Sequence, residues 1–439
     1  MKSQKILMAL LGFTFSVIFS VSGYATPSVE ELNAQIQELM NRVKVLEAQK
    51  ESSQKENLKI EASLTSLKKT DEEKKDSWTN NIKIAGDYRA RFDEIYYRNC
   101  YPDRMDYGRW RVRIRLGFDA KINEDADFKL RFATSEDRNI GMQGNPVSTN
   151  LTLTNVASKK PVFIDVGQLD YHPSSIKGLH IYSGKIDLPF FTPGKSDLVW
   201  DHDITLEGAT AKLDSKSGKF DISTALGAFM FMDRPESNDS SMLGGQVSFK
   251  YNLPKANHYI TFGGAYYNFD HTKGQQVFDW QGLNLNYGNT KTAQNSYLYA
   301  YKELEYGLEA GWTVGTGTNS LPISVFGNTV KNVAADVPNN KGWLAGFSVG
   351  KLSKPGSLFF RYDYRKLEKD AVLGAITDSD SFGGGTNGKG HRFSIERQLM
   401  KNMLVKVIYF ADKINIADDD KTNKNATFNR IQMEVQTKF

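Results

Sequence analysis

In the last ten residues, 430–439, strongly polar side chains alternate with Ile, Met, Val, Thr and Phe, and the final residue is Phe439. A period of two predicts a β-strand with one apolar face and one polar face. In bacterial outer-membrane barrels the apolar face of each strand meets lipid, the polar face meets a wet interior, and aromatic side chains lie at the interface. The alternation, with an aromatic at its end, therefore predicts the closing strand of such a barrel.

The same alternation recurs from about residue 81 onward, in short runs separated by turns. It predicts about sixteen antiparallel strands, with the expected ranges 81–93, 109–120, 127–136, 161–172, 178–187, 204–213, 219–232, 242–252, 257–269, 304–314, 321–331, 342–350, 357–367, 391–398, 403–411 and 430–439. The connecting segments alternate between short and long, as the turns and loops of transmembrane barrels do. An even strand number would place both ends of the barrel domain in the periplasm. A barrel of about sixteen strands encloses a water-filled channel unless something plugs it.

Residues 29–67 follow a different pattern, because apolar side chains there recur at alternating spacings of three and four. The register begins with Val29, Leu32, Ile36, Leu39, Val43 and Leu46, and continues through Lys50, Ser53, Asn57, Ile60, Leu64 and Leu67. No Gly or Pro interrupts it, so we expect an α-helical coiled coil followed by a charged hinge at residues 68–75. The first core residues favour a dimer. The alternative is a solvated helix that folds back on the barrel.

The N-terminus has the features of a secretory signal peptide. Lys2 and Lys5 precede an apolar run over residues 6–21, and Gly23 and Ala25 frame a small-x-small cleavage site. The alternative is a permanent membrane anchor. Beyond this run no stretch approaches the ~20 apolar residues that a membrane helix needs. The expected organisation is a signal peptide at 1–25, a periplasmic coiled coil and hinge at 26–75, and a transmembrane barrel at 76–439.

Composition is compatible with a barrel and argues against other classes. Hydrophobic residues make up 40% of the chain, which fits strands whose inner half is polar. The formal net charge of +5 is too small to indicate a nucleic-acid partner. The single cysteine, Cys100, cannot form an internal disulfide. A closed hydrogen-bonded barrel would give an exported chain the stability that disulfides give other secreted proteins.

The polar faces of the first three predicted strands are rich in cationic residues. They carry Arg89, Arg91, Arg111, Arg113, Arg115, Lys129 and Arg131, and a later strand adds Arg361, Asp363 and Arg365. A charge that faces lipid at the bilayer centre costs ~2–4 kcal/mol, so we expect these side chains to line the pore. A wall of arginines favours anions. The alternative is that the arginines face carboxylates, since Asp363 and Glu396 show that both signs occur on the polar faces.

The long segment after the fifth predicted strand is the candidate constriction. By analogy with general porins, this third external loop would fold inward and narrow the pore. Its charged residues Lys195, Asp197, Asp201 and Asp203 are the candidates for the narrowest point. The alternative is a loop that lies on the rim.

Covalent chemistry is not expected. Two carboxylates and an imidazole in direct succession, as in Asp201-His202-Asp203, cannot all face one ion on a strand, so no metal site is predicted there. The six histidines are scattered, and no grouping of Ser, His and acid stands out. We therefore expect neither an enzyme nor a bound cofactor. The alternative is a barrel phospholipase or protease, because the members of a catalytic triad meet in space rather than in sequence.

Several stretches carry a family resemblance, namely residues 108–118, 148–153 and 198–208. Together with the signal peptide, the coiled coil and the terminal Phe439, they resemble the family of putative porins over nearly the whole chain. The resemblance implies an outer-membrane channel, usually trimeric. Residues 183–190 also resemble the related phosphate-selective porins. A cluster of lysines is expected at the constriction in that group, and here only Lys185 and Lys195 lie nearby.

The resulting hypothesis is a passive diffusion pore for small hydrophilic solutes or ions, with a preference for anions, in the bacterial outer membrane. Its expected partners are membrane lipid, two further copies in a homotrimer, and the cell wall through a stalk in the periplasm. The alternative function is a structural anchor whose stalk tethers the outer membrane and whose loops act as an adhesin. Conductance separates the two, because a tether need not conduct.

Overall fold

The computed structural model describes residues 28–75, 81–100, 105–136, 144–153, 156–255, 257–282, 285–317, 320–418 and 424–439. The chain divides into two compact units, 1–77 and 78–439, and each is considered by itself. The predicted signal peptide at 1–25 lies outside the described residues. In the described part of the chain, no helix has the length and apolar character needed to cross a membrane.

The first unit contains one long helix, α1 (Val29–Lys75). A capping box begins it: the Glu31 N–H donates to Ser28 Oγ at 3.2 Å, and the Ser28 N–H donates to Glu31 Oε2 at 3.1 Å. The predicted helix is confirmed, and residues 68–75, where the sequence suggested a hinge, are helical. Apolar side chains at the predicted core positions are exposed, Ile36 by 48% and Leu39 by 59%. The coiled coil stays a prediction.

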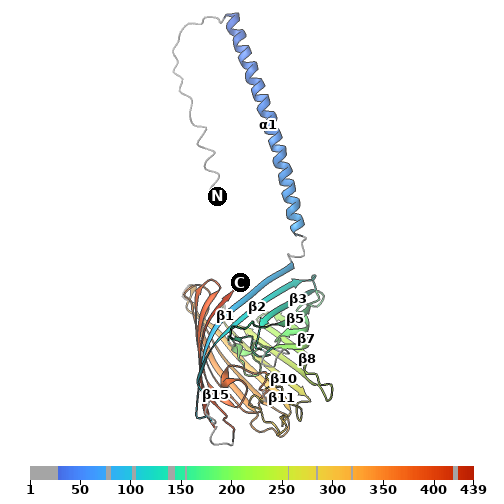
Figure 1. Ribbon diagram of the computed structural model, residues 1–439. Helices are drawn as coiled ribbons and strands as arrows, with labels where there is room; N and C mark the ends of the chain where they lie inside the picture. The colour runs from blue at the N-terminus through green and yellow to red at the C-terminus, as the bar shows by residue number, and fades with distance from the viewer. Residues whose placement is uncertain are drawn as a thin grey trace. The chain divides into compact units, whose positions relative to one another are not determined.

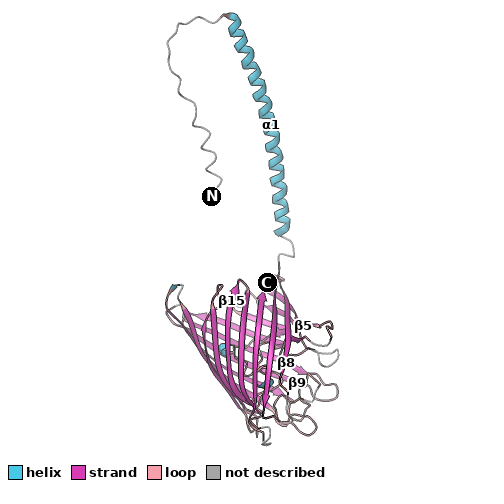
Figure 2. Ribbon diagram, turned by 60° about the vertical axis from the view of Figure 1, so that its left-hand side comes forward, coloured by secondary structure: helices cyan, strands magenta, loops and turns pink. Residues whose placement is uncertain are grey.

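The second unit is a closed antiparallel barrel (Figures 1 and 2). Its long strands in the described residues are β1 (Ile82–Arg98), β2 (Tyr107–Lys121), β3 (Ala126–Thr134), β5 (Val162–Tyr171), β6 (Leu179–Asp187), β7 (Thr205–Ser217), β8 (Phe220–Met232), β9 (Ser240–Asn252), β10 (Tyr259–Asp270), β11 (Tyr301–Val314), β12 (Leu321–Asn332), β13 (Lys341–Gly350), β14 (Leu358–Leu367), β15 (Gly388–Met400), β16 (Met403–Ile414) and β17 (Ala426–Lys438). These sixteen correspond one to one to the predicted strands, so the predicted strand number is confirmed for the described residues. A further strand, β4 (Leu151–Thr152), was not predicted.

Closure of the barrel joins the two ends of the unit. β1 pairs with β2 on one side and with β17 on the other. Beyond β17 the backbone of Phe439 still exchanges two hydrogen bonds of 3.0 Å with Gly86 of β1. The short strand β4 pairs with Arg111 and Val112 of β2. β3 pairs with the later part of β2, from Arg115 to Lys121, so β4 extends the sheet beyond β3 along the same edge of β2. Among the described residues, every long strand of the ring pairs with a neighbour on both sides. A sheet that spans a membrane must be closed in this way, because lipid cannot satisfy unpaired backbone groups.

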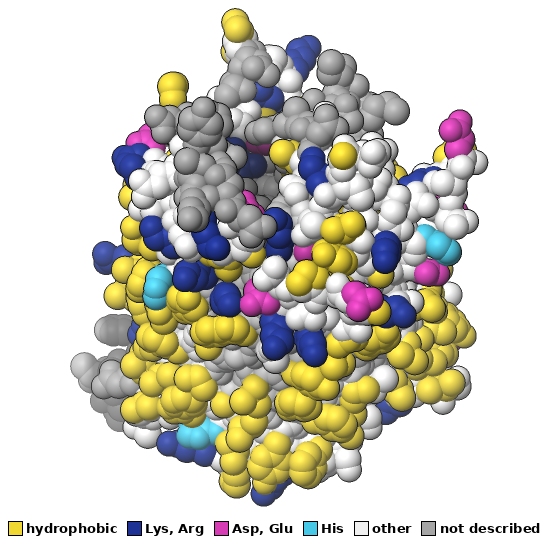
Figure 3. Space-filling model, turned by 90° about the horizontal axis from the view of Figure 1, so that it is seen from below, with side chains coloured by type: hydrophobic (Ala, Val, Ile, Leu, Met, Phe, Trp, Pro, Cys, Tyr) yellow, Lys and Arg dark blue, Asp and Glu magenta, His cyan; other side chains and the backbone are white. Residues whose placement is uncertain are grey.

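The two faces of the strands differ as the alternation predicts. In β17 the side chains of Arg430, Gln432 and Glu434 are buried inside the barrel, whereas Met433 between them is 47% exposed on the outside. Figure 3 views the molecule from the end with the long loops. Hydrophobic side chains cover the lower half of that view, and Lys and Arg side chains gather along the upper border of this area. The outer wall therefore has the apolar character that contact with lipid requires.

Candidate functional site inside the barrel

Residues 188–204, which connect β6 to β7, run inside the barrel. The Phe191 N–H donates to Gln246 Oε1 of β9 at 2.5 Å, and Gln246 Nε2 donates to the Phe191 carbonyl at 3.0 Å. Farther around the wall, the Gly194 N–H donates to Glu309 Oε2 of β11 at 2.6 Å. The segment thus leaves its own strands and reaches other parts of the barrel wall.

The tip of this segment requires a glycine. Gly194 has a φ of +57°, and a Cβ atom built there would lie 2.3 Å from the ring of Phe326 on β12. The carbonyl of Gly194 accepts a hydrogen bond from Arg361 of β14. Next to it, Ser196 Oγ accepts one from Asn328 Nδ2 at 2.9 Å. Only a residue without a side chain lets the backbone approach the wall this closely.

A second segment, residues 368–387 between β14 and β15, also enters the barrel. The sequence analysis did not predict this. The apolar run from Ala371 to Leu373 inside a long loop could have indicated it, and all three side chains are fully buried in the structure. This segment packs on the first one. The Asp201 N–H donates to the Ile376 carbonyl at 2.9 Å, and Asp201 Oδ2 accepts from the Ser379 N–H at 3.0 Å.

Aromatic side chains fix the inward segments to the wall. Trp200 and Phe190 from the first segment each lie 5.0 Å, between ring centroids, from Tyr267 of β10. The Tyr267 hydroxyl donates to Glu305 Oε2 of β11 at 2.9 Å, so its polar end is satisfied. Trp200 and Tyr267 are almost completely buried. The inward path of residues 188–204 therefore rests on apolar packing as well as on hydrogen bonds.

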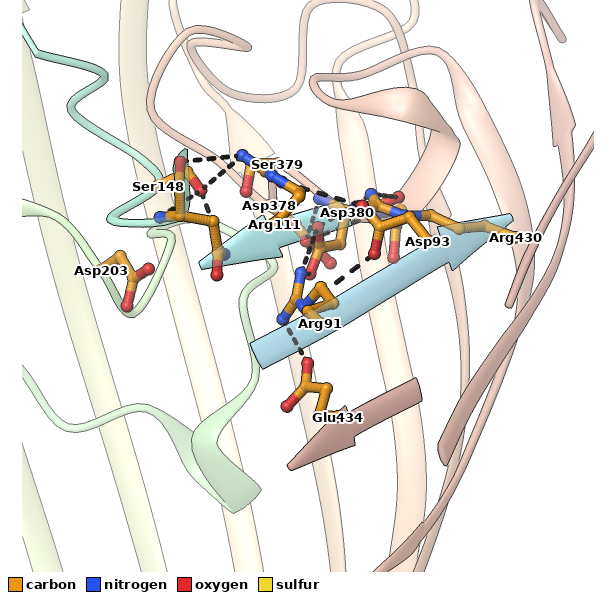
Figure 4. A network of polar contacts seen from close by, with 12 residues as sticks. Arg91, Asp93, Arg111, Ser148, Asp203, Asp378, Ser379, Asp380, Arg430 and Glu434 are labelled. Atoms are coloured by element: carbon orange, nitrogen blue, oxygen red, sulfur yellow. Dashed lines mark hydrogen bonds and ion pairs between the residues drawn. The ribbon is translucent and has the colours of Figure 1, made fainter. Parts of the chain in front are cut away.

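The predicted cationic residues of β1 are paired with carboxylates. Arg91 Nη2 lies 2.5 Å from Glu434 Oε1, and Arg91 Nη1 lies 3.3 Å from Asp380 Oδ2 on the second inward segment (Figure 4). Arg89 Nη1 lies 3.9 Å from the other oxygen of Glu434, and Arg89 Nε donates to Asn150 Oδ1 at 3.1 Å. The side chains of Arg89, Arg91 and Glu434 are nearly inaccessible to solvent.

Asp93 and Asp380 are the acidic centre of this network (Figure 4). Arg430 Nη2 lies 2.6 Å from Asp93 Oδ2, and Arg430 Nη1 lies 2.8 Å from Asp380 Oδ1. Burial would raise the pKa of Asp380, but the guanidinium groups of Arg430 and Arg91 outweigh it and hold that pKa well below its usual range. Asp93 could have been anticipated, because it follows Arg91 with a spacing of two. Asp380 could not, because its position depends on the path of a loop.

Each of the three predicted arginines of β2, Arg111, Arg113 and Arg115, contacts a different carboxylate. Arg111 Nη2 lies 3.3 Å from Glu136 Oε1. Arg113 Nη2 lies 2.7 Å from Asp87 Oδ1 on β1.

Arg115 of β2 reaches the first inward segment, where its Nη2 lies 2.5 Å from Asp203 Oδ1. Burial would raise the pKa of Asp203, but Arg115 and its neighbours lower it well below the usual range. A predicted wall residue and a predicted loop residue are thus in direct contact.

The predicted cationic residues of β3 are also paired with a carboxylate. Lys129 and Arg131 of β3 contact Asp187, Lys129 Nζ at 2.5 Å and Arg131 Nη1 at 3.0 Å. These side chains are more exposed to solvent than the ion pairs of β1 and β2, and that of Asp187 is 38% exposed.

On the far wall, Asp363 lies among three arginines. Arg361 Nε and Arg392 Nε each lie 2.9 Å from its Oδ2, and Arg365 Nη2 lies 3.3 Å from its Oδ1. Arg392 Nη1 also lies 3.2 Å from Asp197 Oδ2 on the first inward segment.

His202 differs from its neighbours because its side chain is 64% exposed to the interior space. Its Nδ1 lies 3.0 Å from Asp197 Oδ1, and its Nε2 lies 3.6 Å from Asp203 Oδ1. The surrounding protein lowers the pKa of His202, but Asp197 and Asp203 raise it more, so that it is about 9. Lys195, the fourth predicted residue of this segment, is exposed.

Two cavities lie along the arginines of β2. One of about 420 Å³, at the long-loop end, is lined by Arg111 and Arg430 together with Tyr287. The other, of about 370 Å³, is lined by Asp119 and Lys129 at the end with the short turns. Since Arg113 and Arg115 lie on β2 between Arg111 and Asp119, their ion pairs occupy the stretch between the two cavities. Ion-paired arginines thus separate the two cavities along β2.

Comparisons with known proteins agree with this architecture. The sequence matches the family described as Putative porin over residues 58–302 and 324–439. No curated relative matches it significantly. Among solved structures, OprB from Pseudomonas putida is 12% identical with a TM-score of 0.51, and the match covers 82% of this chain and 95% of OprB. OmpF from Salmonella typhi is 12% identical with a TM-score of 0.46 over 83% of this chain and 99% of OmpF. The match with OprB supports the fold alone.

Proposed function

Because the chain belongs to the Putative porin family, it is an outer-membrane channel protein, and we propose that it conducts small hydrophilic solutes by passive diffusion. The inward course of residues 188–204 carries the proposal. Asp203 on this segment lies 2.5 Å from Arg115, which places a carboxylate of the loop against a guanidinium of the wall. A pore narrowed in this way selects by diameter and by fixed charge, without covalent chemistry.

A preference for anions is the finer part of the proposal. It rests on the arginines of β1, β2 and β3, which concentrate positive charge on one part of the wall. Each predicted arginine nevertheless has a carboxylate oxygen within 4.0 Å, so much of its field is cancelled. We therefore expect the preference to be weak. The more exposed Lys129 and His202 would contribute most to it, because their side chains are 35% and 64% exposed.

The proposed organisation of the whole chain keeps a signal peptide at 1–25, a periplasmic stalk at 26–75 and a pore domain at 76–439. The exposed apolar positions of α1 support a stalk that associates with other copies of itself, because isolated helices bury such residues only against a partner. A homotrimer is the proposed assembly. We further propose that the stalk binds the cell wall.

A structural anchor is the second candidate function. The observation that favours it is the length of α1, which at 47 residues and about 1.5 Å per residue could reach far from a membrane. An anchor need not conduct ions. A channel must.

Planar-bilayer recording of the purified chain tests the proposal. We expect discrete conductance steps, and larger steps after removal of residues 189–199. Shortening the exposed connection at 233–239, between β8 and β9, is the matched control and should leave the steps unchanged. A folded barrel that inserts but never conducts would overturn the proposal and favour the anchor.

A further inference from the structure

Two aspartates and two histidines meet on the inner wall at the short-turn end of the barrel. Asp127 on β3 and Asp170 on β5 are directly opposite each other in the register. His172 follows Asp170 with a spacing of two and therefore lies on the same face. His180 is contributed by β6, the next strand around the barrel. They were not recognisable from the sequence, because only the pairing of three strands brings them together.

Their distances suit a metal ion. His172 Nε2 lies 3.2 Å from Asp127 Oδ2, and the ligand atoms of Asp127, Asp170 and His172 all lie within 4.8 Å of one another. Ligands at ~2.0–2.1 Å around a tetrahedral zinc ion are separated by roughly 3.3 Å. The pair of Asp127 and His172 thus has the spacing of one edge of such a tetrahedron, and Asp170 offers a third ligand atom within 4.8 Å of both.

A further partner orients Asp170. His180 Nδ1 lies 3.0 Å and 3.1 Å from its two carboxylate oxygens. The His180 ring is itself held by Tyr182, on which it stacks at 5.7 Å. Metal ligands are commonly fixed by a second residue of this kind, and its removal typically weakens metal binding.

The charges around the cluster also favour a bound cation. Two carboxylates directly opposite each other on one face repel. The nearest lysine on β3, Lys129, is already paired with Asp187. Lys121, opposite Asp127 on β2, has an exposed side chain. A divalent ion between Asp127 and Asp170 would remove the repulsion more completely than either lysine.

We propose that Asp127, Asp170 and His172 bind a borderline divalent transition-metal ion such as Zn²⁺, with His180 as the positioning residue for Asp170. An imidazole among carboxylates selects this class over Mg²⁺ and Ca²⁺, which prefer oxygen ligands alone. Asp127 and Asp170 also line the cavity of about 370 Å³, so the ion can enter from the lumen and keep water as a further ligand. The site does not depend on the proposed channel function.

Zinc binding to the purified full chain, with a tag that lacks histidine, tests this inference. Isothermal titration should show one Zn²⁺ per chain, and Co²⁺ should give the visible absorption of a four-coordinate site. We expect Asp127→Asn and His172→Ala each to weaken binding by more than about 100-fold, and His180→Ala by about 10- to 100-fold. The matched control is His258→Ala at the same end of the barrel, because the His258 ring contacts the backbone of Thr313 and no carboxylate.

Retention of the heat-modifiable electrophoretic mobility of a folded barrel shows that each variant is folded. Equal zinc affinity in the wild type and the Asp127→Asn/His172→Ala double variant would overturn the proposal. So would displacement of Zn²⁺ by an equal concentration of Mg²⁺, because this would indicate a non-selective acidic surface.

Discussion

Arg91 and Glu434 form an ion pair of 2.5 Å across the seam where the first and last strands of the barrel meet. The two residues are 343 positions apart in the chain, yet they are direct partners in the β1–β17 register. Both side chains are almost completely buried. The pair therefore links closure of the sheet to the polar network that holds the second inward segment.

Truncation of one partner should destabilise the barrel strongly. Glu434→Ala would leave Arg91 and Arg89 buried without their shared carboxylate, and breaking a buried pair costs about 3–5 kcal/mol. We expect a loss of this size in the free energy of unfolding, measured by urea denaturation in lipid vesicles.

The control for this prediction is an exposed pair. Arg98 Nη1 lies 2.7 Å from Asp106 Oδ1, but the two side chains are 59% and 34% exposed. Arg98→Ala should therefore cost far less than Glu434→Ala, because solvent screens an exposed pair. Equal losses for Glu434→Ala and Arg98→Ala would show that the seam pair has no special role.

The contact of Gly194 with Phe326 gives a second prediction. In Gly194→Ala the new methyl group would collide with the Phe326 ring, and we expect residues 188–204 to move away from the wall. Single-channel conductance should change, with a wider distribution of open levels. Gly218→Ala is a close control, since Gly218 has a φ of +58° and nothing within 4 Å of a built Cβ. Both variants incur the ~1–2 kcal/mol cost of a left-handed conformation, so only the collision differs. Identical conductance in the two variants would contradict the idea that this contact sets the pore.

The strands were predictable from the sequence because a barrel wall in lipid enforces period two at nearly every position. Arg91 and Asp93 show this well, since both follow the inward phase of β1. The strand ends were less predictable. β1 continues to Arg98, beyond the expected end at residue 93, because its pairing with β17 extends to Arg98.

The interior of the barrel was predictable only in part. The alternation indicates which arginines face inward, but it carries no information on their partners, because those depend on the register of strands and on the paths of loops. Asp380 contacts Arg91 and Arg430 from a segment that no periodicity constrains. Carboxylates lie beside the arginines because burying an unpaired charge is costly. Arginines that face carboxylates were the alternative that the sequence left open.

The stalk offers a third prediction. Ile36 and Val43 are both about half exposed on α1, at positions that a coiled coil would bury. Ile36→Lys with Val43→Lys should lower the fraction of trimer in detergent, measured by sedimentation, because lysine at core positions destabilises the helix contact. Glu38→Lys, at an exposed position outside the predicted core, is the control for added charge. Conductance per channel should stay the same in both. A trimer fraction unaffected by the core variant would leave assembly to the barrel alone.

His202 gives the fourth prediction, which concerns pH. Since Asp197 and Asp203 raise its pKa from 6.5 to about 9, the imidazole keeps its proton at neutral pH and loses it as pH rises through about 9. The interior then loses one positive charge beside three carboxylates, with Asp201 Oδ1 also 3.9 Å from Nδ1. The ratio of anion to cation permeability should fall between pH 8 and pH 10 in reversal-potential measurements.

In His202→Gln that decrease should be absent, and the ratio should already be low at pH 7. His271→Gln serves as the control, because His271 lies beside Asp270 in the connection after β10 rather than on an inward segment. Every other side chain is the same in the wild type and in His202→Gln, so the difference between these two proteins isolates the imidazole. An equal pH response in the wild type and His202→Gln would show that solutes do not pass His202.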